Sequence, residues 1–173
     1  MESVDDQQIR AFLHELGNRY PKKATLVLLG GSALCLLGSS RPTLDIDYVG
    51  HDLHKTELQQ MIDLVAQEMR IEIEPVPIDE FVPVPADAQS RWLPVGQFGL
   101  IDVFIMDPYT IALSKLDRGF ETDIDDILFL LRQQLITFEQ LESLTLVALA
   151  EAQAFNMIPE MVRTQLEVIR SSL

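Results

Sequence analysis

The chain has 173 residues, of which 47% are hydrophobic, and its 27 acidic and 13 basic side chains give a formal net charge of -14. This length suits one domain with a substantial core, and the excess of carboxylates disfavours an extended nucleic acid as partner, because like charges repel. No apolar run approaches the ~20 residues that cross a bilayer and no charged leader precedes one, so we expect a cytoplasmic protein without a membrane partner.

The first part of the chain predicts helix, strand, helix and strand in turn. Apolar residues at positions 9, 12, 13 and 16 recur at helical spacing, and Gly17 is expected to end that helix. Residues 24–30, ATLVLLG, are apolar throughout, which is typical of a central strand buried on both faces. A short helix over residues 32–37 follows the glycines, and residues 43–49 alternate as a second strand.

The middle of the chain predicts a helix, an edge strand and a hairpin. Apolar residues at positions 58, 61, 62 and 65 have helical spacing, and the IEIEP run at residues 71–75 alternates as an edge-like strand. Five of the nine prolines lie between Pro75 and Pro94, so we expect irregular structure there. Residues 91–106 are again extended, with a hairpin turn over residues 97–99.

The last part of the chain predicts helices with recognisable starts. Asp107 followed by Pro108 predicts an N-cap and the first residue of a helix that runs to about Leu116. Three more helices are predicted after it. Two begin with the spacing of a capping box, Thr122 with Asp125 and Thr137 with Gln140, and the third begins at Pro159.

Two aspartates separated by one residue stand on the second predicted strand. Because side chains alternate between the faces of a strand, Asp45 and Asp47 point the same way and can reach one cation. Nucleotidyl transfer requires a divalent cation, and Mg²⁺ prefers carboxylate oxygens together with those of the substrate. Asp102, on a later strand, is a candidate third carboxylate that ligates a metal or draws a proton from an attacking hydroxyl. The alternatives are a solvated strand face for Asp45 and Asp47, and a hairpin cap or a pair with a nearby basic group for Asp102.

The glycines after the first strand form a candidate phosphate site. Gly30 and Gly31 let the backbone approach phosphate oxygens, amides at the start of the following helix would face an anion, and Ser32 adds a hydroxyl. Arg41 is a candidate to bind phosphate through two hydrogen bonds. A simple turn for the glycines, and a solvated loop position for Arg41, are the alternatives.

In this order the motifs resemble the nucleotidyltransferase superfamily of polymerase beta type. The resemblance is carried by Gly31-Ser32, twelve further residues, Asp45-Ile46-Asp47, and the later strand around Asp102. The following DPYTIALSKLDR and ETDIDDILFLL segments are similar to minimal bacterial members related to the AbiEii-type toxins and the DUF6036 group. The resemblance covers roughly residues 9–135.

The resemblance implies an α+β fold, with a small mixed β-sheet flanked by helices in residues 1–135 and a C-terminal helical extension, residues 136–173, packed on the same unit. It implies Mg²⁺, an NTP, and transfer of a nucleoside monophosphate or similar unit onto a small molecule, a protein or a tRNA end. The implied metal-binding and catalytic residues are Asp45, Asp47 and Asp102. The implied triphosphate-binding residues are Gly31, Ser32 and Lys115, to which the glycine turn and the loop before the acidic strand add the candidates Gly30 and Arg41.

The helical segment matches the subgroup at three further positions. Lys115 corresponds to the lysine of its Lys-Leu helix, where it would contact phosphate, and Asp123 and Asp126 match its Asp-x-x-Asp helix start. Thr122 departs from the pattern, because a lysine is common there in relatives. The alternatives are a solvated basic edge formed by Lys115 and Arg118, and acids that interact with the helix dipole.

The leading hypothesis is therefore a magnesium-dependent nucleotidyltransferase, and a toxin-antitoxin or phage-defence setting is the further hypothesis for its role. The alternative is a catalytically silent nucleotide-binding or partner-binding module of the same fold. That alternative follows from the shortage of positive charge near the expected triphosphate and from the amphipathic helices after Thr137, which offer a surface for a protein partner or a second copy. A purely structural cation at the acidic strand is a third interpretation.

Overall fold

The computed structural model describes residues 2–173 and divides them into two compact units. Unit 1 contains the chain up to Pro77 together with Leu93–Met106, and unit 2 contains Ile78–Trp92 and Asp107–Leu173. The chain thus leaves unit 1 after Pro77, returns for one hairpin, and leaves again after Met106. The boundary expected at residues 135 and 136 lies inside unit 2.

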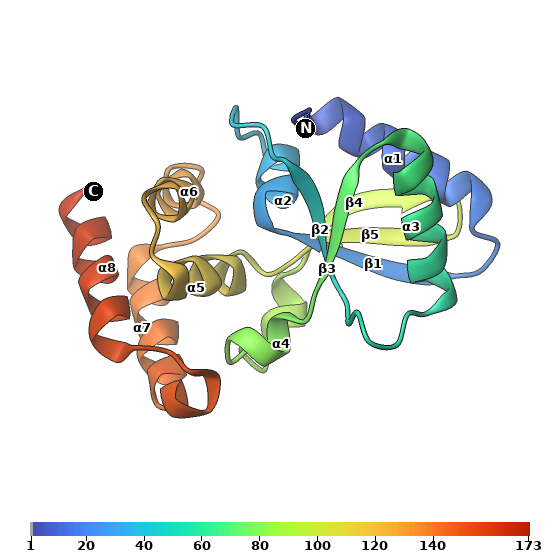
Figure 1. Cartoon of the computed structure of the whole chain (residues 1–173). Helices are drawn as coiled ribbons and strands as arrows, with labels where there is room; N and C mark the ends of the chain where they lie inside the picture. The colour runs from blue at the N-terminus through green and yellow to red at the C-terminus, as the bar shows by residue number, and fades with distance from the viewer. Residues whose placement is uncertain (1) are drawn as a thin grey trace. The chain divides into compact units, whose positions relative to one another are not determined.

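Unit 1 is built on a five-stranded mixed sheet with the strand order β3-β2-β1-β5-β4 (Figure 1). The strands are β1 (Ala24–Leu29), β2 (Asp45–Val49), β3 (Glu72–Val76), β4 (Leu93–Phe98) and β5 (Ile101–Ile105). Strand β1 runs parallel to β5 and antiparallel to β2, β2 runs parallel to β3, and β4 and β5 form an antiparallel hairpin. The α+β class is confirmed, as are a central β1 and an edge β3.

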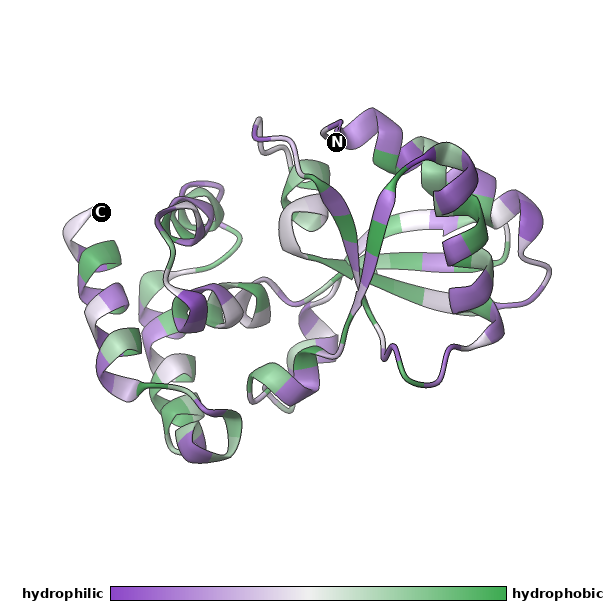
Figure 2. Cartoon of the chain, in the orientation of Figure 1, coloured by the Kyte–Doolittle hydropathy of each residue, from purple (hydrophilic) through white to green (hydrophobic). Residues whose placement is uncertain are grey.

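Helices α1 (Asp6–Arg19) and α3 (Glu57–Met69) cover one face of this sheet. Their apolar residues, such as Phe12 and Ile62, form one core with Leu28, Ile46 and Val103 of the strands. Figure 2 shows the pattern behind this packing, since β1 is almost entirely apolar whereas β2 alternates polar and apolar residues. The polar residues of β2 therefore lie on the opposite face.

Gly17 does not end the first helix, which continues to Arg19. A Cβ atom at Gly17 would lie 2.5 Å from the backbone carbonyl of Phe98, and one at Gly99 would lie 2.2 Å from the Gly17 carbonyl oxygen. Gly99 also has a φ of +60°, which favours glycine. The two glycines therefore allow α1 to contact the hairpin turn directly, and close packing explains Gly17 where a helix stop was predicted.

Unit 2 is helical in its described residues. It contains two short 3₁₀ helices, η1 (Ala88–Arg91) and η2 (Ala152–Phe155), and the helices α4 (Ile78–Phe81), α5 (Pro108–Arg118), α6 (Glu121–Arg132), α7 (Phe138–Leu149) and α8 (Pro159–Ser171). Helix α5 contacts α6, α7 and α8, so it lies at the centre of the group. Among the described helices, none combines the length and the apolar character that crossing a membrane requires.

The predicted cap of α5 is confirmed and is part of a larger hydrogen-bond group. The fully buried Asp107 carboxylate accepts from the backbone N–H of Tyr109 at 3.1 Å and from the hydroxyl of Thr110 at 2.9 Å. Arg91 donates to the same carboxylate from two nitrogens, at 2.9 and 2.8 Å. These bonds fix the segment that ends at Arg91 to the first turn of α5, and they raise the pKa of the Arg91 guanidinium.

The predicted start of α6 is wrong by two residues. The helix begins at Glu121. The carboxylate of Asp123, three residues after Phe120, accepts the backbone N–H of Phe120 at 3.2 Å. Thr122 and Asp125 were expected to form this cap. Several acidic residues occupy this stretch, so more than one spacing fits a cap, and the structure uses the buried Asp123 rather than the exposed Asp125.

Candidate metal centre

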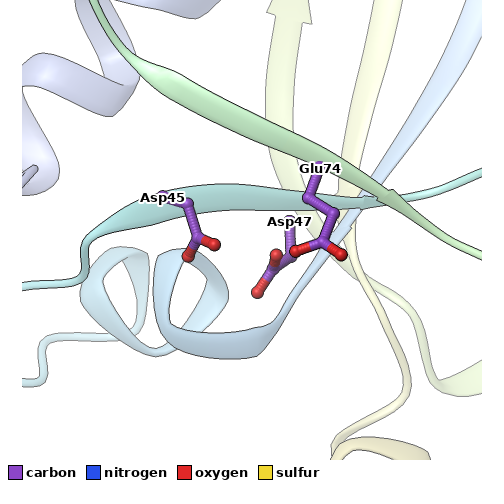
Figure 3. A group of neighbouring side chains, drawn as sticks. All are labelled: Asp45, Asp47 and Glu74. Atoms are coloured by element: carbon purple, nitrogen blue, oxygen red, sulfur yellow. The ribbon is translucent and has the colours of Figure 1, made fainter.

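Three carboxylates meet on the face of the sheet opposite α1 and α3. One oxygen from each of Asp45, Asp47 and Glu74 lies within 4.8 Å of the others. Figure 3 shows the three side chains on the same side of β2 and β3, directed toward the turn that begins α2 (Gly30–Leu36). Such a group of oxygens is what a hard divalent cation binds.

Asp45 and Asp47 are brought together by the alternation of β2, as predicted, and Glu74 joins them through strand pairing. Strands β2 and β3 are parallel neighbours, and Asp47 and Glu74 are partners in their register. Glu74 was not among the predicted site residues. A signal for it was present, because strand, helix and strand in succession favour a parallel pair, and the IEIEP run places an acid on every second position.

Asp102, the third acid expected from the sequence, is not brought to this cluster. It is an exposed residue of β5 and pairs with Thr25 of β1, whereas Asp47 pairs with Leu29. The two β1 positions are four residues apart, which corresponds to about 13 Å along a strand. Asp102 thus shares the face of Asp45 and Asp47 but lies toward the other end of the sheet.

Gly30 makes room for the Asp47 carboxylate. A Cβ atom at Gly30 would lie only 2.1 Å from Oδ2 of Asp47, and the φ of Gly30 is +65°. Both observations call for glycine, one for space and one for backbone conformation. The residue therefore positions a carboxylate of the cluster.

We expect the substitution Gly30→Ala to disrupt the cluster. The new methyl group would displace the Asp47 carboxylate, and the left-handed backbone would cost roughly 1 kcal/mol of folding free energy. A thermal melt with and without Mg²⁺ would measure both effects, and we expect a lower melting temperature that no longer rises with the metal. The control is Gly38→Ala, since Gly38 also has a positive φ but a Cβ there meets nothing within 4 Å. A metal response retained in Gly30→Ala would contradict this role.

The hydroxyl of Ser32 is used inside the protein. Ser32 is fully buried, and its Oγ donates to the backbone carbonyl of Leu29 at 2.9 Å and accepts the backbone N–H of Asp47 at 3.3 Å. It therefore ties the first turn of α2 to β1 and β2. The triphosphate contact expected of this hydroxyl would have to compete with both bonds.

Arg41 lies in the exposed segment between α2 and β2. With Asp5, Asp6 and Cys35 it lines a shallow depression beside the start of α1. The Cys35 thiol donates to the backbone carbonyl of Arg41 at 3.2 Å, and burial raises the pKa of that thiol. Cys35 is a buried packing residue, as predicted, while the phosphate contact of Arg41 stays a prediction.

Lys115 belongs to a buried ion cluster of unit 2. Its Nζ donates to Oδ2 of Asp126 at 2.7 Å and lies 3.6 Å from Oδ1 of Asp123. Arg118 donates two hydrogen bonds to Asp123, at 3.2 and 2.7 Å. Lys115, Asp123 and Asp126 are each at most 6% exposed, so the alternative of a solvated edge does not hold for Lys115. Its ammonium neutralises carboxylates of the protein.

One of three comparisons with known proteins found a match, and it agrees with the family that the motifs resemble. A model of the family described as a nucleotidyltransferase of unknown function (DUF6036) matches residues 6–171. Searches of the curated proteins and of the solved structures gave no significant match. Because the family model covers almost the whole chain, this protein belongs to the DUF6036 family of nucleotidyltransferases.

Proposed function

We propose that this member of the DUF6036 family is a magnesium-dependent nucleotidyltransferase that moves a nucleoside monophosphate, or a similar unit, from an NTP to an acceptor. The observation that carries the proposal is the convergence of Asp45, Asp47 and Glu74 within 4.8 Å on one face of the sheet. Family membership supports the same class of reaction.

The donor set fits Mg²⁺ or Mn²⁺. All three side chains offer carboxylate oxygens, which are the ligands that these hard cations prefer, and no softer sulfur or imidazole ligand belongs to the group. Three acids so close together also repel one another, so a divalent cation would stabilise the arrangement. We therefore assign the ligand roles to Asp45, Asp47 and Glu74 and leave Asp102 out.

Each part of this site has a distinct task in the proposed reaction. A bound Mg²⁺ would neutralise the triphosphate and help to fix the line of attack. Asp45, Asp47 and Glu74 would hold the cation from two paired strands, which keeps its position fixed relative to the sheet. The backbone N–H groups of Gly30 and Gly31, at the beginning of α2, would face the phosphates beside it.

The acceptor is proposed by exclusion. A net charge of -14 opposes a long nucleic acid, which leaves a small molecule, a protein or a tRNA end. Calorimetric titration with ATP, CTP, GTP and UTP in the presence of Mg²⁺ tests the donor, and labelled NTP incubated with cell extract tests transfer. We expect one NTP to bind and to label an acceptor. Failure of all four to bind would refute the proposal.

A catalytically silent module of the same fold is the second candidate. It is favoured by the state of two side chains expected at the triphosphate, because the Ser32 hydroxyl bonds to the backbone and the Lys115 ammonium pairs with Asp126. Under this hypothesis Mg²⁺ and NTP bind without turnover. Any labelled acceptor in the extract assay eliminates it.

A further inference from the structure

Thr43 stands two residues before the first residue of the acidic strand β2 and contacts Asp45. The two residues are two positions apart, with a bend at Leu44 between them. The Thr43 hydroxyl donates to the backbone carbonyl of Asp45 at 3.1 Å and lies 3.5 Å from Oδ1 of its carboxylate. It is therefore the neutral hydroxyl beside a carboxylate of the proposed metal centre.

The protein holds Thr43 in place from two further sides. The backbone N–H of Val4 donates to the Thr43 carbonyl, the Thr43 N–H donates to the Val4 carbonyl at 3.1 Å, and these bonds form an isolated antiparallel bridge. On the other side, a Cβ atom at Gly31 would lie 2.6 Å from the Thr43 hydroxyl oxygen. Gly31 thus leaves room for Thr43, just as Gly30 does for Asp47.

The isolated backbone bridge of Thr43 with Val4 does not need a hydroxyl at this position. Valine has nearly the same shape as threonine and suits extended backbone equally well. What valine lacks is the hydroxyl, whose one proton points to the backbone carbonyl of Asp45 at 3.1 Å and can turn to Oδ1 of the carboxylate, 3.5 Å away. Without that donor, repulsion from Asp47 and Glu74 would turn the Asp45 carboxylate away from its neighbours, because like charges this close favour separation.

We propose that Thr43 is a positioning residue, whose hydroxyl orients the Asp45 carboxylate for a divalent cation. The inference rests on the proposed function, since it assumes that Asp45, Asp47 and Glu74 bind that cation. Side chains that hydrogen-bond to metal ligands set the orientation of those ligands, and their loss typically weakens metal binding about 10- to 100-fold. The long contact at 3.5 Å places Thr43 at the lower end of this range.

The test is the affinity for Mn²⁺, measured by electron paramagnetic resonance of the free ion, in the wild type and in Thr43→Val, Thr43→Ser and Thr43→Ala. We expect Thr43→Val and Thr43→Ala to bind about tenfold more weakly and Thr43→Ser, which keeps the donor, to bind like the wild type. The matched control is Thr25→Val, which makes the same substitution in the same sheet but away from the proposed metal centre. Thr25 pairs with Asp102, whereas Asp47 of the centre pairs with Leu29, four positions further along β1. A melt without metal reports whether each variant is folded.

The outcomes separate this inference from the function on which it rests. Equal Mn²⁺ affinity in the wild type and the folded Thr43→Val and Thr43→Ala variants would overturn the positioning role alone. A loss shared by Thr43→Ser would also overturn it, because shape rather than the hydroxyl would then matter. Absence of Mn²⁺ binding by the wild type would overturn both the inference and the proposed metal centre.

Discussion

Replacing Asp45 and Asp47 together by asparagine is expected to abolish nucleotidyl transfer and leave the fold intact. The double variant removes two of the three proposed ligands, and a metal in such a reaction contributes several kcal/mol to stabilisation of the transition state. A loss of about 4 kcal/mol corresponds to roughly a thousandfold in rate. Label transfer from NTP to the acceptor measures this directly.

The same double variant is expected to gain stability when no metal is present. Asp45, Asp47 and Glu74 repel one another in the folded protein, and removing two charges relieves a repulsion on the order of 1 kcal/mol. The free energy of unfolding in urea with a chelator should therefore rise, and the stabilisation by Mg²⁺ should vanish. The charge control is Asp125→Asn, an exposed position on α6. Full transfer activity in the double variant would refute the ligand roles.

Replacing Lys115 by methionine is expected to destabilise unit 2 strongly. The substitution leaves the buried carboxylate of Asp126 without its ammonium partner at 2.7 Å and takes a second cation away from Asp123. Removing one partner of a buried pair costs about 3–5 kcal/mol, because the remaining charge stays in a poorly solvated place. Urea denaturation followed by far-ultraviolet circular dichroism measures this loss.

Two further variants locate the cause of that loss. The double variant Lys115→Met with Asp126→Asn removes both charges and should recover much of the stability. Lys22→Met breaks the exposed pair with Glu57 and should scarcely change it. If Lys115 instead serves mainly to contact phosphate, Lys115→Met will keep its stability and lose NTP affinity, which is the opposite pattern.

Local sequence signals predicted most elements of this fold. The apolar ATLVLLG run is the central strand β1, the IEIEP run is the edge strand β3, and Asp107 with Pro108 begins α5. These signals work because alternation, helical spacing and caps depend on neighbouring residues. Gly17 was misinterpreted because its role depends on the distant turn at Gly99, and no local pattern records such a contact.

The site was predicted in part for the same reason. Alternation alone places Asp45 and Asp47 on one face, but the third carboxylate depends on which strand pairs with β2 and in which register. Glu74 is the register partner of Asp47 on β3. Asp102 instead pairs with Thr25 of β1, four positions from Leu29, which is the β1 partner of Asp47. The order of motifs along the chain therefore does not identify the third carboxylate, because the register between the strands decides which acid lies beside Asp47.

The affinity for Mn²⁺ in two single variants, Glu74→Gln and Asp102→Asn, tests the metal centre most directly. Both substitutions remove one negative charge from an exposed strand position of the same sheet, so a general effect of charge is matched between them. We predict that Glu74→Gln weakens binding by at least about tenfold and that Asp102→Asn binds like the wild type. Loss of binding in Asp102→Asn with full retention in Glu74→Gln would contradict the assignment.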